Sequence, residues 1–183
     1  SWHNLRALDP QGPWPQLTLA LAYATEAHLF ITDPNQSPFN VGTQLALADF
    51  TLAQVGELNR RYQEPLRDEG ETERFYALIG GHPYLTQRGL YEMARRKLEL
   101  TAVEAQADHD AGLFGGHLRN VLALLERDPM LCEALRGVLR REPGLSLAHF
   151  YRLRSAGVLT GEAPLQARPR CELYARYLKR SLL

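Results

Sequence analysis

The stretch LRNVLALLERDPMLCEALRGVLRREPGLSLAHFYRLRSAGVL, residues 118–159, decides the fold of the C-terminal part of the chain. Apolar residues recur in it three or four positions apart, which places them on one face of a helix. They form three blocks: Leu118, Val121, Leu122 and Leu125; Leu131, Leu135, Val138 and Leu139; and Leu147, Phe150 and Tyr151. The stretch therefore predicts three successive amphipathic helices.

A hairpin and a closing helix are expected directly after these helices. Val158–Leu159 and Leu165–Ala167 flank a turn that contains glycine and proline, and a final amphipathic helix begins at about Arg170. Three helices, a hairpin and a helix follow one another in this order in a winged-helix domain, which is a helix-turn-helix variant. We therefore expect residues 112–183 to form a winged-helix domain.

The middle of the chain, residues 51–111, also carries helix signals. Thr51 with Gln54 three residues later is a capping box, and Gly80–Gly81 followed by Pro83 marks the end of one helix and the start of the next. The expected helices are Leu52–Tyr62, about Glu71–Ile79, Tyr84 to about Lys97, and a short helix capped by Thr101 and Glu104.

Residues 1–50 differ from the rest because they contain unalternated apolar runs. LTLALAY, Leu17–Tyr23, predicts a strand buried on both faces, as in a parallel sheet, and a buried helix is the competing interpretation. His28–Thr32 and Gln44–Leu47 are further strand candidates, which is too little sheet for a complete α/β domain. We expect the chain to be mainly α with a small β component, and residues 1–50 to be part of a larger α/β core.

The zero net charge of this 183-residue, 20.7 kDa chain is the sum of two unlike parts. Residues 136–183 carry ten basic and three acidic side chains, a net charge of +7, whereas residues 1–135 carry 11 basic and 18 acidic ones, a net −7. A total of zero argues against a generally basic nucleic-acid coat protein. The basic part either docks on the acidic remainder, which is the simpler interpretation, or contacts DNA phosphates or another partner. The candidate contacts are Arg152 and Arg154 on the third helix and Arg168 and Arg170 in the wing.

The sequence gives little support for a metal site or for a catalytic nucleophile. Asp108–Asp110 with His117 could supply ligands, but the spacing lacks the tight Cys/His pairs of a zinc site, so we expect no metal site. Cys132 and Cys171 fall on expected helices without a neighbouring base, so we expect structural thiols and no catalytic residue. Two cysteines fit a reduced cytosol, and no apolar run reaches the ~20 residues of a membrane span. We therefore expect a cytoplasmic protein without a membrane partner.

A phosphate-binding loop is also missing from the sequence. Neither lysine, Lys97 nor Lys179, ends the Gly-rich pattern of a Walker A motif, and no acidic residue ends a strand as in a Walker B motif. We therefore expect no ATP hydrolysis by this chain alone.

Two short segments remain as candidate sites. Gly80–Leu85, GGHPYL, combines a sharp turn with a proline ring that can pack on a base, although the local pattern by itself favours a plain helix–turn–helix connection. Thr25–Glu26 lies at the carboxyl end of the expected strand, where ligands bind in open α/β sheets.

These segments, with the loop DPNQSPFNVG at Asp33–Gly42 and the end RPRCELYARYL, resemble the AAA-like domain of bacterial, notably cyanobacterial, STAND-type P-loop NTPases. The resemblance covers essentially the whole chain. It implies the last strands of a P-loop core in residues 1–50, a helical lid in residues 51–111 and a winged helix in residues 112–183. The Walker motifs would lie before Ser1.

The resemblance also implies what the chain does. Thr25 would stand where a sensor residue meets the γ-phosphate, and Gly81, His82 and Pro83 would form the motif whose proline packs near adenine. The cofactor would be ATP or ADP, with Mg²⁺ in the complete protein. The partners would be the upstream NTPase core and effector or sensor domains, in signalling or defence. Self-association through the apolar strand and a DNA-binding or protein-interaction module are the alternatives.

Overall fold

The computed structural model describes residues 7–13, 16–18, 20, 43, 45 and 47–183. The chain divides into two compact units, Ser1–Ala46 and Leu47–Leu183, of which the second is described throughout. The strand expected at Leu17–Tyr23, the loop at Asp33–Gly42 and the candidate Thr25 lie wholly or largely outside the described residues.

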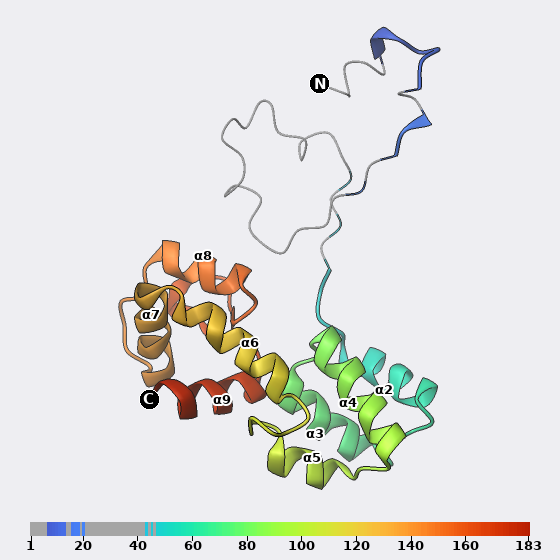
Figure 1. The fold of residues 1–183 in the computed structure, drawn as a ribbon, viewed down its shortest axis with the longest axis vertical. Helices are drawn as coiled ribbons and strands as arrows, with labels where there is room; N and C mark the ends of the chain where they lie inside the picture. Colours follow the sequence, from blue (N-terminus) through green and yellow to red (C-terminus); the bar gives the residue numbers. More distant parts are fainter. Residues whose placement is uncertain (1–6, 14–15, 19, 21–42, 44, 46) are drawn as a thin grey trace. The chain divides into compact units, whose positions relative to one another are not determined.

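The unit Leu47–Leu183 is mainly helical, with one small sheet (Figure 1). Its elements are α2 (Leu52–Arg61), α3 (Glu69–Ile79), α4 (Pro83–Arg96), α5 (Leu100–Gln106), α6 (Gly115–Glu126), α7 (Pro129–Arg140), α8 (Leu147–Ser155), β1 (Leu159–Thr160), the 3-10 turn η5 (Pro164–Gln166), β2 (Arg168–Pro169) and α9 (Glu172–Leu182). None of the helices among the described residues is long and apolar enough to cross a membrane.

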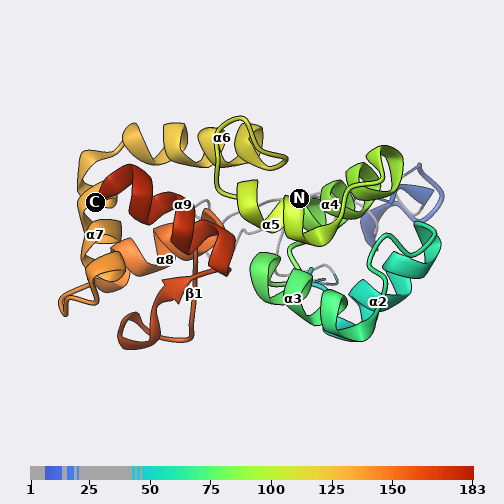
Figure 2. The same cartoon turned by 90° about the horizontal axis from the view of Figure 1, so that it is seen from below.

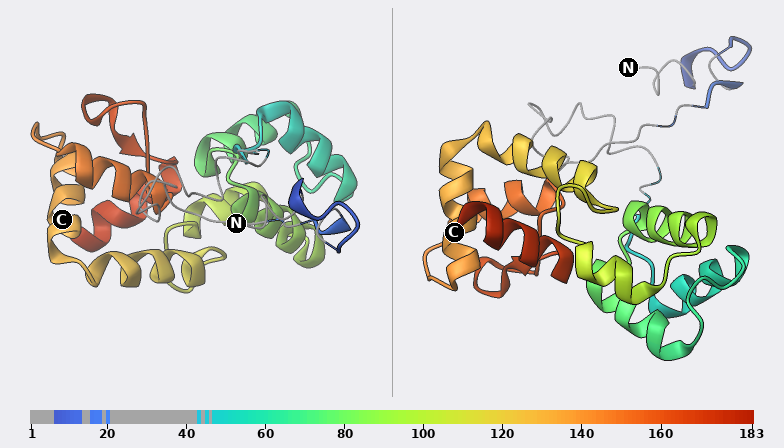
Figure 3. Two further views of the ribbon diagram at one scale, coloured as in Figure 1. Left: turned by 90° about the horizontal axis from the view of Figure 1, so that it is seen from above. Right: turned by 60° about the horizontal axis from the view of Figure 1, so that its bottom comes forward.

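Local signals set the ends of the first helices. The capping box of α2 is confirmed, because the Gln54 amide N–H donates to Thr51 Oγ1 and the Thr51 N–H donates to Gln54 Oε1 at 2.9 Å. Helix α3 begins after Asp68, which accepts from the Glu71 N–H at 2.7 Å, and ends at the left-handed Gly80. Helices α2, α3, α4 and α5 pack together as one group (Figure 3).

The prediction that Thr101 and Glu104 cap α5 is wrong. The helix begins at Leu100, and its N-cap Glu99 makes no side-chain capping bond. Burial sets this start, because the fully buried Leu100 fixes the first turn in the core. Glu104 pairs instead with Arg74 of α3, at 3.1 Å from Nε to Oε1.

The second group of elements follows the expected order of three helices, a hairpin and a helix (Figure 2). The strands β1 and β2 pair antiparallel, with Leu159 opposite Pro169 and Thr160 opposite Arg168. The second strand expected at Leu165–Ala167 is wrong by about three residues. Pro164 starts the turn η5 there and the Leu165 side chain is 93% exposed, so this apolar residue does not mark a strand.

One apolar core connects the two groups. It extends from Val55 in α2 to Leu178 in α9, and α9 contacts both α3 and α7. Fully burying a Leu or Phe side chain contributes about 1.5–3 kcal/mol, so the shared core holds residues 51–111 and 112–183 together.

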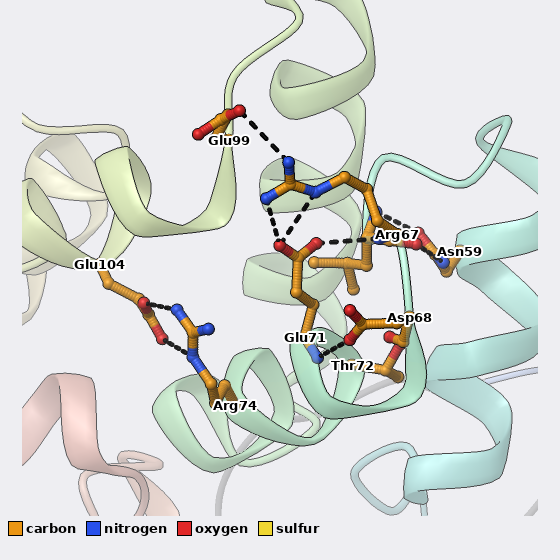
Figure 4. A network of polar contacts seen from close by, with 9 residues as sticks. Asn59, Arg67, Asp68, Glu71, Thr72, Arg74, Glu99 and Glu104 are labelled. Atoms are coloured by element: carbon orange, nitrogen blue, oxygen red, sulfur yellow. Dashed lines mark hydrogen bonds and ion pairs between the residues drawn. The ribbon is translucent and has the colours of Figure 1, made fainter.

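A polar network fixes the connection between α2 and α3 (Figure 4). The Asn59 Nδ2 donates to Leu66 O at 2.9 Å, and the Leu66 N–H donates to Asn59 Oδ1 at 3.0 Å. Arg67 donates through its backbone N–H and its guanidinium to the buried Glu71, and these bonds lower the pKa of that carboxyl. In the same loop, Gln63 and Glu64 have positive φ, and their N–H groups donate to Arg60 O and Asn59 O.

Candidate functional site

The Gly80–Gly81 turn is held between two other segments of the chain. Gly81 has φ +71°, and the Phe50 N–H donates to Gly81 O at 2.9 Å. A Cβ on Gly81 would overlap the Phe50 carbonyl oxygen, and a Cβ on Gly80 would lie 3.0 Å from Cys171 Cβ. Only glycine combines a positive φ with contacts this close, so the turn needs both glycines.

His82 and Pro83 begin α4 immediately after this turn. Pro83 occupies the first helical position, where its missing N–H costs no helical hydrogen bond, as the sequence predicted. His82 is the N-cap, and its carbonyl accepts from the Thr86 N–H and hydroxyl, each at 2.9 Å. The buried His82 Nδ1 has no hydrogen-bond partner among the described residues. The turn therefore contains a ring nitrogen that lacks a partner and is covered by the surrounding residues.

Burial lowers the pKa of His82 to about 4, and the positive charges of Arg170 and His117 act in the same direction. The ring is therefore neutral at pH 7, and Nδ1 can accept a hydrogen bond if Nε2 carries the proton.

Because of this shift, we expect the protein to lose stability as the pH falls from about 6.5 toward 4. The unfolded chain binds a proton on His82 in that window and the folded chain does not, so protonation favours unfolding. The ring signal of His82 in NMR spectra should titrate near pH 4. The His82→Gln variant should show a flatter dependence of the unfolding free energy on pH. A His82 titration midpoint near 6.5 would contradict the assignment.

His117 and Tyr174 lie beside His82. The His117 Nε2 and the Tyr174 hydroxyl are hydrogen-bonded at 2.7 Å, and the His82 and His117 ring centroids are 5.5 Å apart. Burial, with Arg170, lowers the pKa of His117, and burial raises the pKa of Tyr174. His117 thus belongs to an aromatic cluster, and no group of three metal-ligating side chains occurs in the described part of the chain.

The structure places Arg170 in this same region, in contact with Asp49. The Arg170 Nε donates to Asp49 Oδ2 at 3.1 Å, and a second bond joins Nη2 and Oδ1. Both side chains are partly buried. Such a bidentate pair is geometrically specific, so Arg170 is engaged here and not presented on a free surface of the hairpin.

The other three arginines proposed for DNA contact differ in whether they form an ion pair. Arg152 forms an ion pair with Asp128, the N-cap of α7. Arg154 and Arg168 are exposed and form no ion pair with any described residue. The structure thus brings together Gly81, His82, Pro83 and Arg170 but not the three remaining arginines.

We call the group formed by Asp49, Gly81, His82, His117, Arg170 and Tyr174 the junction cluster. It joins the segment before α2, the start of α4, the start of α6, the segment before α9 and the first turn of α9. It offers a ring nitrogen without a partner, aromatic faces, a tyrosine hydroxyl bonded to an imidazole and one paired guanidinium.

Comparison with known proteins supports one assignment. The family model described as AAA-like domain matches residues 1–180. No curated protein and no solved structure matches the chain. Since the match extends over nearly the whole sequence, the chain belongs to the AAA-like domain family.

Proposed function

We propose that the chain is the nucleotide-sensing regulatory half of a STAND-type AAA-like ATPase, and is not catalytic by itself. AAA-like domains are ATPase-related modules that bind nucleotides in general. In this proposal, residues 1–50 end the ATPase core, residues 51–111 form the helical lid and residues 112–183 form the winged helix. The complete protein would act as a switch in signalling or defence, with effector or sensor domains as partners.

The observation that supports a sensing role is the meeting of three segments at the Gly80–Pro83 turn. Phe50 bonds to Gly81, Cys171 packs on Gly80, and Arg170 pairs with Asp49. A ligand that moves this turn therefore changes contacts on the core side and on the winged-helix side together. Such differential contacts are what a ligand needs to shift a conformational equilibrium.

The residues of the turn fit an adenine nucleotide. Pro83, which is only partly buried, would pack its ring against the base, and movement of the turn would expose the unpaired Nδ1 of His82 to it. ATP or ADP would supply the change in phosphate charge that distinguishes the two states, with Mg²⁺ in the complete protein. Thr25, outside the described residues, is proposed to meet the phosphates.

The Pro83→Ala variant of the protein with its upstream phosphate-binding core tests the proposal. Loss of two ring methylenes from the contact is worth about 1.5 kcal/mol, which corresponds to about a tenfold weaker affinity for ADP. Isothermal titration measures this. Pro129→Ala is the matched control, because Pro129 also begins a helix. Unchanged affinity and an unchanged nucleotide response in Pro83→Ala would refute the assigned role.

DNA binding by the winged helix remains the alternative proposal, and it is supported by the exposed Arg154 and Arg168. Titration with duplex DNA at two salt concentrations separates it from the sensing role, because phosphate contacts weaken as salt rises.

A further inference from the structure

A polar pocket lies between the first turns of α4 and α6. Its volume is about 550 Å³, and it is open to solvent, with most of its lining residues exposed. Its polar wall is formed by Tyr84 and Arg88 of α4 and by Gly116, His117, Arg119 and Asn120 of α6, and Leu113 completes the lining. The pocket shares His117 with the junction cluster, but neither the sensing role of the turn nor the proposed DNA surface uses Arg88 or Arg119.

The side chains that line the pocket are rich in hydrogen-bond donors. Two arginines, a tyrosine and an asparagine are among its lining residues, and no aspartate or glutamate is. Two permanent positive charges without an acidic neighbour in the wall favour an anionic ligand. A planar guanidinium group can donate two parallel N–H bonds to two oxygens of one phosphate, so a phosphate group suits a wall that contains two arginines.

The partners of the two arginines leave donors free for a ligand. Arg119 donates one N–H to the Asp110 carbonyl, and its Nη2 lies 4.0 Å from where a Cβ on Gly116 would be. Arg88 lies 3.6 Å from Glu92, a buried carboxylate that Arg95 and Arg96 share. Three arginines and one carboxylate leave a net charge of +2 on this part of α4. Because each guanidinium has five N–H donors, these contacts leave both arginines able to bind an anion.

We infer that this pocket binds a phosphate-bearing anion through Arg88 and Arg119. The site differs from the base contact proposed for His82 and Pro83, and it uses only residues of the unit Leu47–Leu183. The shared chemistry is a polyphosphate group, whether free or as part of a nucleotide.

Titration calorimetry on the 183-residue chain, in low-salt buffer without phosphate, tests the inference. The probes are tripolyphosphate, ATP and adenosine. Tripolyphosphate should bind, and Arg119→Ala should weaken it at least about tenfold, as expected for loss of one charge-assisted contact. Arg154→Ala, which removes an exposed arginine of α8 outside the pocket, should leave the affinity unchanged.

Gly116→Asp provides a second variant that does not depend on losing an arginine. A carboxylate in the first turn of α6 stabilises the helix and pairs with Arg119, so it should abolish anion binding without unfolding the protein. Equal affinities for ATP and tripolyphosphate support a site that recognises phosphate alone. Tighter binding of ATP that depends on both Arg119 and Pro83 supports a nucleotide as the source of the phosphates.

Two results would overturn the inference. One is the absence of tripolyphosphate binding at millimolar concentration. The other is an equal loss of affinity in Arg119→Ala and Arg154→Ala, which would indicate only nonspecific attraction to positive charge. Adenosine binding that is sensitive to Pro83→Ala, without any tripolyphosphate binding, would leave the sensing role intact and refute the anion site.

Discussion

Replacing Gly81 with alanine is expected to lower the free energy of unfolding by about 3 kcal/mol or more, the largest single effect of any substitution in the junction cluster. A left-handed backbone costs an L-residue roughly 1–2 kcal/mol, and Gly81 has φ +71°. The new Cβ would also overlap the Phe50 carbonyl oxygen and lie 3.0 Å from the Phe50 carbonyl carbon. Neither atom can rotate away, since both belong to the backbone. The variant must therefore break the Phe50–Gly81 hydrogen bond to relieve the overlap.

Gly56→Ala is the matched control for this substitution. Gly56 lies within α2, and a Cβ there meets no atom within 4 Å. Alanine is favoured over glycine inside a helix by about 1 kcal/mol, so this variant should be more stable than the wild type. Urea unfolding followed by circular dichroism measures both variants. If Gly81→Ala were as stable as Gly56→Ala, the turn would not be pinned against Phe50.

Asn59→Ala is expected to cost about 3 kcal/mol, because it leaves two buried backbone groups of Leu66 without partners. Asn59 is 6% exposed and Leu66 is 2% exposed, so water cannot replace the lost amide without opening the loop. The Asn59 side-chain amide makes both bonds to the same residue, at 2.9 and 3.0 Å, and so satisfies both backbone polar groups of Leu66. The same loop contains two residues with positive φ, Gln63 and Glu64.

Hydrogen exchange gives a second measurement of this effect. The Leu66 amide should lose protection in Asn59→Ala before the helices do, since the loop opens locally. Gln87→Ala removes an exposed amide from α4 and should change the free energy of unfolding by less than about 0.5 kcal/mol. A loss of less than about 1 kcal/mol in Asn59→Ala would mean that the Leu66 backbone finds other partners.

Signals that act within a few residues allowed much of the helical fold to be predicted. Thr51 with Gln54, the glycines after Ile79 and the proline at position 83 each mark a helix end through local bonding or backbone geometry. The prediction failed where tertiary burial outweighs the local signal. Thr101 has the spacing of a cap, but the buried Leu100 starts the helix earlier.

The candidate site was only half predictable for the same reason. The sequence pointed to Gly81, His82 and Pro83 because turn and helix-start preferences are local. Arg170 and Asp49 are 121 positions apart, and no pattern in the sequence pairs them. The sequence holds one weak signal for Arg170. It stands directly before the final helix and next to Cys171, a residue type that is often buried. His117 was considered only as a metal ligand, because its contact with Tyr174 spans 57 positions.

The packing of Cys171 against Gly80 has a consequence for the chemical reactivity of the chain. Its thiol is buried, and burial raises its pKa to about 11, so the reactive thiolate is scarce at neutral pH. Alkylating reagents can therefore reach it only when α9 separates from the turn. Cys132, buried in α7, has a raised pKa as well and lies outside that contact. The ratio of the two labelling rates thus measures how often the junction opens relative to the rest of the molecule, without any introduced probe.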